Sequence, residues 1–158
     1  MTVPPTGTKI PVSVLVVIHT PALEILLIER AARPGYWQSV TGSIDHRGEA
    51  LEDTAVREVF EETGIVASRE KLVRWDIMRT FEIYPQWRHR FEPGTTHNDE
   101  HMFSLEVPAA VPVRLAPEEH TAWQWLPWEG AVELCFSWTN RDAIALLAEN
   151  RRKGGHIG

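Results

Sequence analysis

The sequence contains very little cysteine, since Cys135 is the only one among 158 residues. A lone cysteine cannot form an intramolecular disulfide and is not a metal site by itself. Basic residues are also outnumbered: 16 lysines and arginines stand against 22 aspartates and glutamates, which gives a formal net charge of −6. General binding to duplex nucleic acid depends on neutralising phosphates, so this charge balance argues against it.

Long hydrophobic runs are absent as well. The longest largely apolar stretch, Val12–Ile18, is far shorter than the roughly 20 residues that span a bilayer. The amino-terminal residues MTVPPTGTK lack the apolar segment of a secretory signal. With 43% hydrophobic residues the chain can bury a core. We therefore expect one soluble, cytoplasmic domain over residues 1–158, with neither nucleic acid nor membrane as a partner.

Hydrophobic patterning predicts strands on either side of a central helix. Strands are expected at Ile10–Ile18, Glu24–Glu29, Trp37–Thr41, Leu72–Tyr84, Met102–Val107 and Thr121–Leu126. Apolar residues at helical spacing predict helices at Ala50–Thr63 and Arg141–Asn150, the second capped by Asn140 or Thr139. The stretch Pro85–Asp99 is expected to be an irregular insert. This order predicts an α/β fold in which helices cover both faces of a mixed sheet.

The strongest chemical signal is the acidic end of the first helix, which reads REVFEETG over residues 57–64. Glu58 and Glu62 lie about 40° apart around such a helix, and Glu61 neighbours Glu58. Like charges at this spacing repel, and the last turn is the unfavourable end of the helix dipole for carboxylates. A hard divalent cation such as Mg²⁺ would explain them, with Glu58 and Glu62 as ligands. The alternative is a solvated face in which Arg57 and Glu61 form an ordinary ion pair.

Together with Glu49, this segment resembles the nudix box over about residues 42–65. That pattern is glycine, five residues, glutamate, seven residues, then Arg-Glu-apolar-any-Glu-Glu-any-Gly-apolar, and residues 49–65 match it in full. The departure lies upstream, where the six residues Ser43–Gly48 separate Gly42 from Glu49 and Ser43 stands at the position of the glycine. Because the helical spacing is intact, we expect a one-residue bulge in this loop.

The resemblance runs from about Lys9 to Leu147. The segments WQSVTGS (37–43) and SWTNR (137–141) narrow it from the whole superfamily to one branch. They are similar to the bacterial dihydroneopterin triphosphate diphosphatases of folate biosynthesis. This implies a nudix-like α/β/α sandwich and an Mg²⁺-dependent (or Mn²⁺-dependent) hydrolysis of dihydroneopterin triphosphate to the monophosphate and pyrophosphate. One alternative is the same chemistry on a nucleoside triphosphate such as dATP. Another is a protein that binds nucleotide without hydrolysis, which the complete set of box carboxylates argues against. The oligomeric state stays open.

The resemblance also implies roles for individual residues. Glu119 aligns with a third metal ligand outside the box, while Glu118 beside it is expected to be solvated. Glu61 ligates or orients, and Arg57 holds it in place. The general base stays open among these carboxylates. The substrate contacts implied are Lys9, Arg30, Thr41, Phe81, Glu82, Ile83, Tyr84 and Ser137.

Within that set, Lys9 and Arg30 are candidates for phosphate binding. Phe81 and Tyr84 are candidates for stacking on a pterin, and Glu82 for accepting hydrogen bonds from its amino-pyrimidinone edge. Alternate side chains of a strand face opposite ways, so all four residues of 81–84 cannot contact one ligand. Phe81 and Ile83 suit a strand core equally well.

Two other groups of polar residues have open interpretations. Arg88-His89-Arg90 is either a solvated charge cluster or a segment that closes over the triphosphate. The three histidines His97, His101 and His120 match no zinc-binding spacing, so surface or supporting positions are expected for them.

Overall fold

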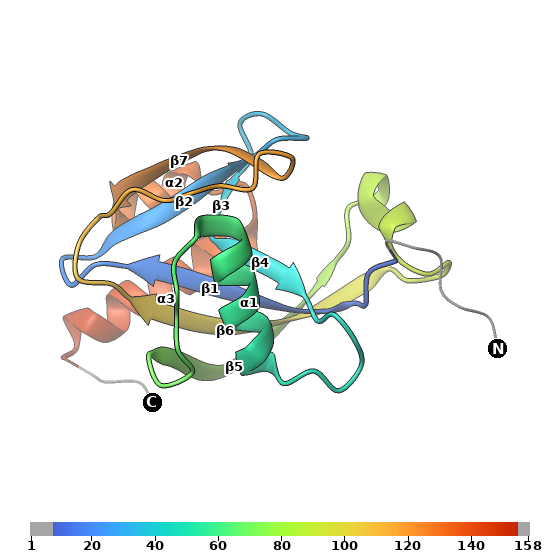
Figure 1. Ribbon diagram of the computed structural model, residues 1–158, viewed down its shortest axis with the longest axis horizontal. Coiled ribbons are helices and arrows are strands. Elements are labelled where there is room, and N and C mark those ends of the chain that lie inside the picture. Colours follow the sequence, from blue (N-terminus) through green and yellow to red (C-terminus); the bar gives the residue numbers. More distant parts are fainter. Residues whose placement is uncertain (1–7, 155–158) are drawn as a thin grey trace.

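The computed structural model describes residues 8–154, so most of the amino-terminal segment for which no secretory signal is expected lies outside the described residues. Within that range, seven strands form one mixed sheet (Figure 1). The elements are β1 (Val12–His19), β2 (Glu24–Arg30), β3 (Trp37–Gln38), β4 (Val40–Ser43), α1 (Leu51–Thr63), β5 (Leu72–Glu82), the 3₁₀ helix η1 (Pro85–Arg90), β6 (His97–Glu106), β7 (His120–Pro127), α2 (Trp128–Leu134) and α3 (Trp138–Arg152).

Strand β1 lies at the centre of the sheet. The order is β3-β2-β1-β6-β5, and in addition β4 pairs with β1 and β7 pairs with β2. The β1–β6 pair is parallel, whereas β1 is antiparallel to β2 and β4. This register sets Gly42 of β4 opposite Val14, and Glu100 of β6 opposite Ser13. Residues from β4 and β6 therefore meet near the start of β1.

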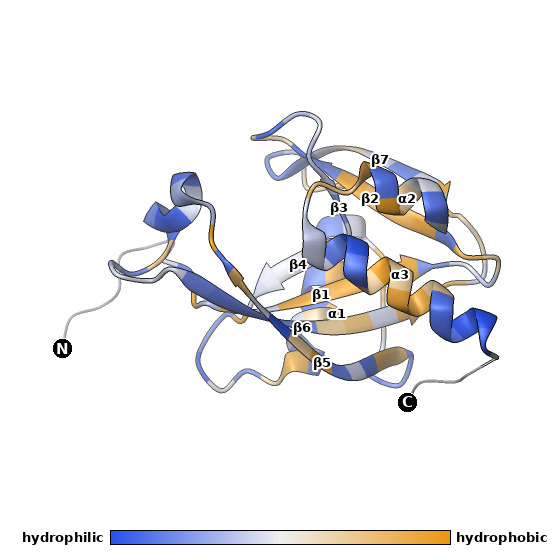
Figure 2. Ribbon diagram, turned by 180° about the vertical axis from the view of Figure 1, so that it is seen from behind, coloured by the Kyte–Doolittle hydropathy of each residue, from blue (hydrophilic) through white to orange (hydrophobic). Residues whose placement is uncertain are grey.

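Helices cover both faces of the sheet, as the sequence predicts. Alternate side chains of β1 point to opposite faces. Val14 and Val16 join the cluster that contains Val59 of α1, while Leu15 joins the cluster that contains Ile144 of α3. Figure 1 places α1 in front of the sheet, and Figure 2, seen from behind, places α3 in front of a largely hydrophobic β1. The α/β class with a mixed sheet is confirmed.

The first helix lies within one residue of its predicted bounds. Its apolar positions Ala55 and Val59 are fully buried. It ends at Gly64, whose left-handed φ of 76° and N–H bond to Phe60 O are typical of a glycine that closes a helix. In the described part of the chain, no helix is both long and apolar enough to cross a membrane.

The structure differs from the prediction in three features around the amino end of α3 and in the Trp37–Thr41 segment. Helix α3 begins at Trp138 with Ser137 as its N-cap, instead of at Arg141 after Asn140 or Thr139. The expected single strand at Trp37–Thr41 is two strands, because β3 pairs with β2 and β4 pairs with β1. Helix α2 is not anticipated, since its seven residues include Gly130 and are too few to show a helical period.

The fourth difference concerns the expected insert Pro85–Asp99. It contains η1, and its last three residues already belong to β6, which begins at His97 instead of Met102. The early part of β6 reads HNDEH, so no apolar alternation reveals it. Its buried residues are instead Asn98 and Glu100. Polar side chains that face inward are characteristic of a site, and these two line the main cavity.

Candidate active site

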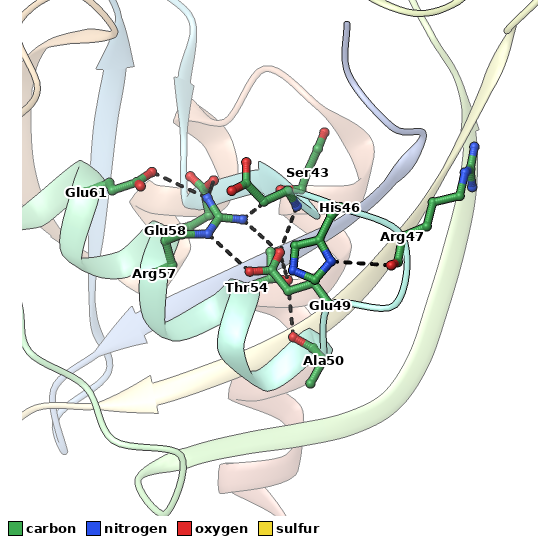
Figure 3. A network of polar contacts seen from close by, with 10 residues as sticks. Ser43, His46, Arg47, Glu49, Ala50, Thr54, Arg57, Glu58 and Glu61 are labelled. Atoms are coloured by element: carbon green, nitrogen blue, oxygen red, sulfur yellow. Dashed lines mark hydrogen bonds and ion pairs between the residues drawn. The ribbon is translucent and has the colours of Figure 1, made fainter. Parts of the chain in front are cut away.

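A partly buried ion pair between Glu49 and Arg57 fixes the loop that precedes α1. The carboxylate of Glu49 accepts hydrogen bonds from Asp45 N (2.7 Å), Thr54 Oγ1 (2.8 Å) and Arg57 Nη2 (3.0 Å) (Figure 3). The hydrogen bond from Arg57 is the main reason that the pKa of Glu49 is lowered to about 2. Glu49 therefore stays ionised and holds the loop against the helix.

Arg57 links this loop to the carboxylates of the helix. Its Nη1 donates to Glu58 Oε1 at 2.8 Å, its Nη2 donates to Ser43 O at 3.2 Å, and Glu61 Oε2 lies 3.6 Å from Nη1 (Figure 3). The contact with Glu61 that the sequence suggests is thus present but is the longest of the three, and Glu61 is half exposed. Arg57 orients Glu58 more directly than Glu61.

The extra loop residue falls after Ser43. Gly42 lies within the regular β1–β4 ladder, and a Cβ atom on it would collide with the carboxyl end of Glu58. Gly42 is therefore the position at which the backbone approaches the acidic helix, although Ser43 occupies the glycine position of the pattern. The lengthening is confined to residues 44–48, where Gly48 adopts a left-handed φ of 91°. The carboxylates keep their helical spacing on α1.

Glu58 and Glu62 form a buried carboxyl pair. Glu62 is only 2% exposed, is hydrogen-bonded to Glu58 and to the backbone N–H of Thr41, and leaves its Oε1 without a partner. Burial raises the pKa of both groups, most strongly that of Glu62. Glu119, in the turn before β7, is close enough for its charge to raise the pKa of Glu62 further.

This pair has the chemistry of a divalent-cation site. In the part of the chain that the structure describes, no three His, Cys, Asp or Glu side chains form a ready-made ligand set. Arg57 pairs with Glu58, but no Lys or Arg among the described residues pairs with Glu62, whose Oε1 is buried without a hydrogen-bond partner. Mg²⁺ binds through one or two carboxylates and completes its shell with water and phosphate oxygens. Glu58 and Glu62 fit that requirement, with Glu119 nearby.

Next to the carboxyl pair lies a group of three cations, Lys9, Arg30 and Arg90. Burial lowers the pKa of Lys9, and the charges of Arg90 and Arg30 lower it further. The Nε of Arg30 is buried without a hydrogen-bond partner, while its guanidinium lies 4.6 Å from the centre of the Trp87 ring. Crowded cations with free donors favour binding of an anion. Arg90 belongs to this group, whereas Arg88 binds Glu82 and Ile83 O.

The cations open into a cavity of about 150 Å³. Thr41, Phe81, Ile83 and Tyr84 line it, together with Ser137. Arg90, from the segment 88–90 that the sequence left open, also lines the cavity. Further lining residues that were not predicted as substrate contacts are Ser13, Trp87, Asn98, Glu100, Phe136, Trp138 and Thr139. Aromatic rings form much of its wall, since Tyr84 packs against Trp87 with centroids 5.2 Å apart and Trp87 meets Phe136 edge-on.

Two of the expected substrate contacts, Glu82 and Ser137, already have partners within the protein. Glu82 borders the cavity, but its side chain is 68% exposed and pairs with Arg88 at 2.9 Å. Ser137 Oγ accepts hydrogen bonds from the backbone N–H and the side chain of Asn140, so it caps α3. The carboxylate of Glu82 therefore already has a charged partner within the protein.

The segments 37–43 and 137–141 form one structural unit. Asn140 Oδ1 accepts a hydrogen bond from Ser39 N at 2.8 Å, and Phe136 N donates to Trp37 O at 3.2 Å. These contacts fasten the start of α3 to the turn between β3 and β4. The two segments look unrelated along the chain, and their contact explains why they form a single motif.

One of the three histidines also belongs to the site. His120 is buried, accepts a hydrogen bond from Gln38 Nε2 at 3.3 Å, and lies 3.9 Å from Glu62 Oε1. Burial lowers its pKa to about 4, so it is neutral at pH 7. Gln38 in turn accepts from Arg30 Nη1. His120 thus supports both the acidic and the basic groups, and its position after Glu119 was the available sequence signal.

Comparison with known proteins gives consistent matches over most of the chain. A family model described as the NUDIX domain matches residues 9–147. Dihydroneopterin triphosphate diphosphatase of Escherichia coli (strain K12) is 42% identical over 145 residues, which cover 90% of this chain and 95% of the relative. The enzyme of the same name from Haemophilus influenzae is 37% identical over 145 residues, with 89% of each chain covered. The solved structure of the E. coli dihydroneopterin triphosphate pyrophosphohydrolase matches with a TM-score of 0.85 and 38% identity, covering 92% of this chain and 99% of that one.

Proposed function

This chain belongs to the nudix family, and from that premise we propose that it hydrolyses dihydroneopterin triphosphate to dihydroneopterin monophosphate and pyrophosphate. The observation that carries the proposal is the continuity of the site. A buried carboxyl pair, three cations and an aromatic cavity follow one another without interruption. This order suits a metal ion, a polyphosphate and a flat ring. The named relatives act on a molecule that has these parts.

The metal site of the proposal consists of Glu58, Glu62 and Glu119. Glu61, exposed at the same helix edge, either ligates the metal or orients the other carboxylates. Arg57 contacts Glu58 and Glu61 and so fixes their orientation. Nudix hydrolases generally use divalent ions, and the all-oxygen donor set favours Mg²⁺, with Mn²⁺ as a substitute. When bound, such an ion neutralises phosphate oxygens and lowers the pKa of a coordinated water.

Lys9, Arg30 and Arg90 bind the triphosphate in this proposal. Phosphoryl transfer requires positioning and charge neutralisation more than covalent chemistry. Arg30 is suited to this, because Gln38 fixes one end of its guanidinium while its buried Nε stays free. A triphosphate on these cations lies between the carboxyl pair and the aromatic wall formed by Tyr84, Trp87 and Phe136. The single cysteine, buried and reduced, fits an action in the reducing cytoplasm.

The test is to incubate the protein with Mg²⁺ and dihydroneopterin triphosphate in ¹⁸O-labelled water and to resolve the products by phosphorus NMR. We expect a pterin monophosphate and pyrophosphate, and the position of the label identifies the phosphorus attacked. Specificity constants for dATP are measured alongside. A value for dATP equal to or above that for the pterin would move the assignment to nucleotides, and no turnover of either would overturn hydrolysis itself.

A matched pair of variants tests the role of the turn before β7. Glu119→Gln removes the carboxylate whose charge reaches Glu62 and Arg30, and we expect kcat to fall at least tenfold. Glu118→Gln makes the same chemical change at the neighbouring exposed position and is expected to leave kcat unchanged. Equal effects from the two variants would contradict the assignment of Glu119.

A further inference from the structure

Four polar side chains form the deep end of the main cavity. Ser13 comes from β1, Asn98 and Glu100 come from β6, and Thr139 comes from the first turn of α3. Each is at most 6% exposed, and each lines the cavity. We call these four residues the polar floor. The catalytic carboxylates lie elsewhere, on α1 and in the turn before β7, so the polar floor has no part in the metal site described above.

The polar floor contains hydrogen-bonding capacity that the protein itself does not use. Asn98 Nδ2 donates to Ser13 Oγ at 2.8 Å, but Asn98 Oδ1 is buried without a partner. The carboxyl group of Glu100 accepts a hydrogen bond from the Thr139 side chain. Among the described residues no Lys, Arg or His forms an ion pair with Glu100, and the nearby Arg79 is bound to Asp142 at 2.9 Å.

A buried carboxylate in this position is costly unless donors reach it from the cavity. Burial raises the pKa of Glu100 to about 7, which reflects the missing counter-charge. Asn98 Oδ1 has no partner, and the Glu100 carboxyl has Thr139 as a neutral partner but no counter-charge, so both present acceptor oxygens to the cavity. A ligand that satisfies them must therefore present several N–H donors side by side, on an edge narrow enough to enter between aromatic walls.

The heterocycles that meet this requirement contain a 2-amino-4-oxopyrimidine ring. Their edge offers a ring N–H next to an exocyclic NH₂, which pair with the two oxygens of one carboxylate. Pterins and guanine share this edge. Adenine instead has a ring nitrogen without a hydrogen beside its NH₂ group. This acceptor nitrogen would face a carboxylate oxygen, which is also an acceptor. The polar floor thus distinguishes between the two classes of ring by the alternation of donors and acceptors.

Building on the proposed function, we propose that Glu100, assisted by Asn98, is the residue that selects a 2-amino-4-oxopyrimidine ring over adenine. Glu82, the carboxylate that the sequence suggested for this task, is exposed and bound to Arg88. Glu100 offers the same chemistry at a buried position in the cavity wall. The selectivity of the enzyme for pterin over dATP then resides in β6 and not in β5.

The experiment compares Glu100→Gln with the wild type on dihydroneopterin triphosphate and on dATP. A glutamine replaces one acceptor with a donor, so it opposes the ring N–H of a pterin but matches the acceptor nitrogen of adenine. We expect kcat/KM for the pterin substrate to fall about 10- to 100-fold, while kcat/KM for dATP stays equal or rises. Glu106→Gln, at the exposed end of the same strand, is the matched control and is expected to leave the ratio unchanged. A fall by the same factor for both substrates would overturn the proposal.

A binding measurement separates this inference from the proposed hydrolysis. Dihydroneopterin, which carries no phosphate, is titrated by its fluorescence against wild type and Glu100→Gln without Mg²⁺. Weaker binding to the variant supports the inference even if the wild type hydrolyses no pterin triphosphate, and unchanged binding overturns it even if hydrolysis is observed. If the variant does not fold, competition on the wild type decides: guanosine must displace the pterin more readily than adenosine does, and equal displacement refutes the selection.

Discussion

Replacing Glu49 with glutamine removes the charge that holds the box loop against α1, and we expect a marked loss of stability at neutral pH. Glu49 is nearly buried and accepts hydrogen bonds from Asp45, Thr54 and Arg57. Its pKa is lowered from 4.5 to about 2, so folding favours the charged form. A glutamine keeps the shape of the side chain, but its NH₂ group is a donor and would face one of the N–H or O–H donors that now bind the carboxylate.

The magnitude follows from this difference in pKa. At about 1.4 kcal/mol per unit, the ionised Glu49 contributes about 3 kcal/mol to the free energy of unfolding at pH 7. Because the pKa in the folded state is lower than in the unfolded state, this contribution is complete above about pH 5 and is lost as the pH falls toward 2. Linkage gives about 2 kcal/mol at pH 3.5, so the wild type and the variant converge in acid.

Urea unfolding of the two proteins at several pH values between 7 and 3.5 measures this difference. The control is Glu52→Gln, which removes a carboxylate in the first turn of α1 that is one-third exposed and pairs with Arg74 at 3.3 Å. Surface pairs of this kind contribute at most about 1 kcal/mol. A Glu49→Gln effect that is independent of pH, or no larger than that of Glu52→Gln, would refute the reasoning.

Three further predictions concern the site itself. Gly42→Ala places a methyl group against the side chain of Glu58 and should lower kcat at least tenfold. The loss of stability should be small, because the flexible Glu58 side chain can move aside. Gly130→Ala adds a methyl group in open space and should leave kcat unchanged. Arg30→Lys replaces the planar guanidinium over the Trp87 ring with an ammonium group and should raise KM for the triphosphate several-fold. An unchanged KM would contradict the role of Arg30 in binding phosphate. Glu62→Gln should abolish the increase in Tm that Mg²⁺ gives the wild type, and a calorimetric scan with and without the metal shows whether it does.

Residues whose roles depend on short-range spacing could be predicted from the sequence. Glu58 and Glu62 are one helical turn apart, so the helical period alone sets them on one edge of α1. Gly64 likewise marks the end of that helix by its own conformational preference. The α/β class followed from the alternation of such elements. These predictions needed no knowledge of how distant segments meet.

The parts that could not be predicted depend on contacts between distant segments. Asn98 and Glu100 read as residues of a polar loop, because a strand that lines a polar cavity has no apolar alternation. Phe136 and Trp87 are ordinary aromatic residues until η1 and the start of α3 are brought together. Glu82 lines the cavity, but nothing local in the sequence indicated that its carboxylate would pair with Arg88.

The hydrogen bond from Ser39 to Asn140 has a consequence for the order of folding. It joins positions 101 apart in sequence and fastens the turn before β4 to the first turn of α3. Contacts of such long range form slowly and after local structure, because the intervening chain must first be ordered. During synthesis the acidic helix emerges long before α3. The nascent chain therefore carries its carboxylates on a preformed helix but gains a complete substrate cavity only when α3 docks, so a folding intermediate is expected to be inactive.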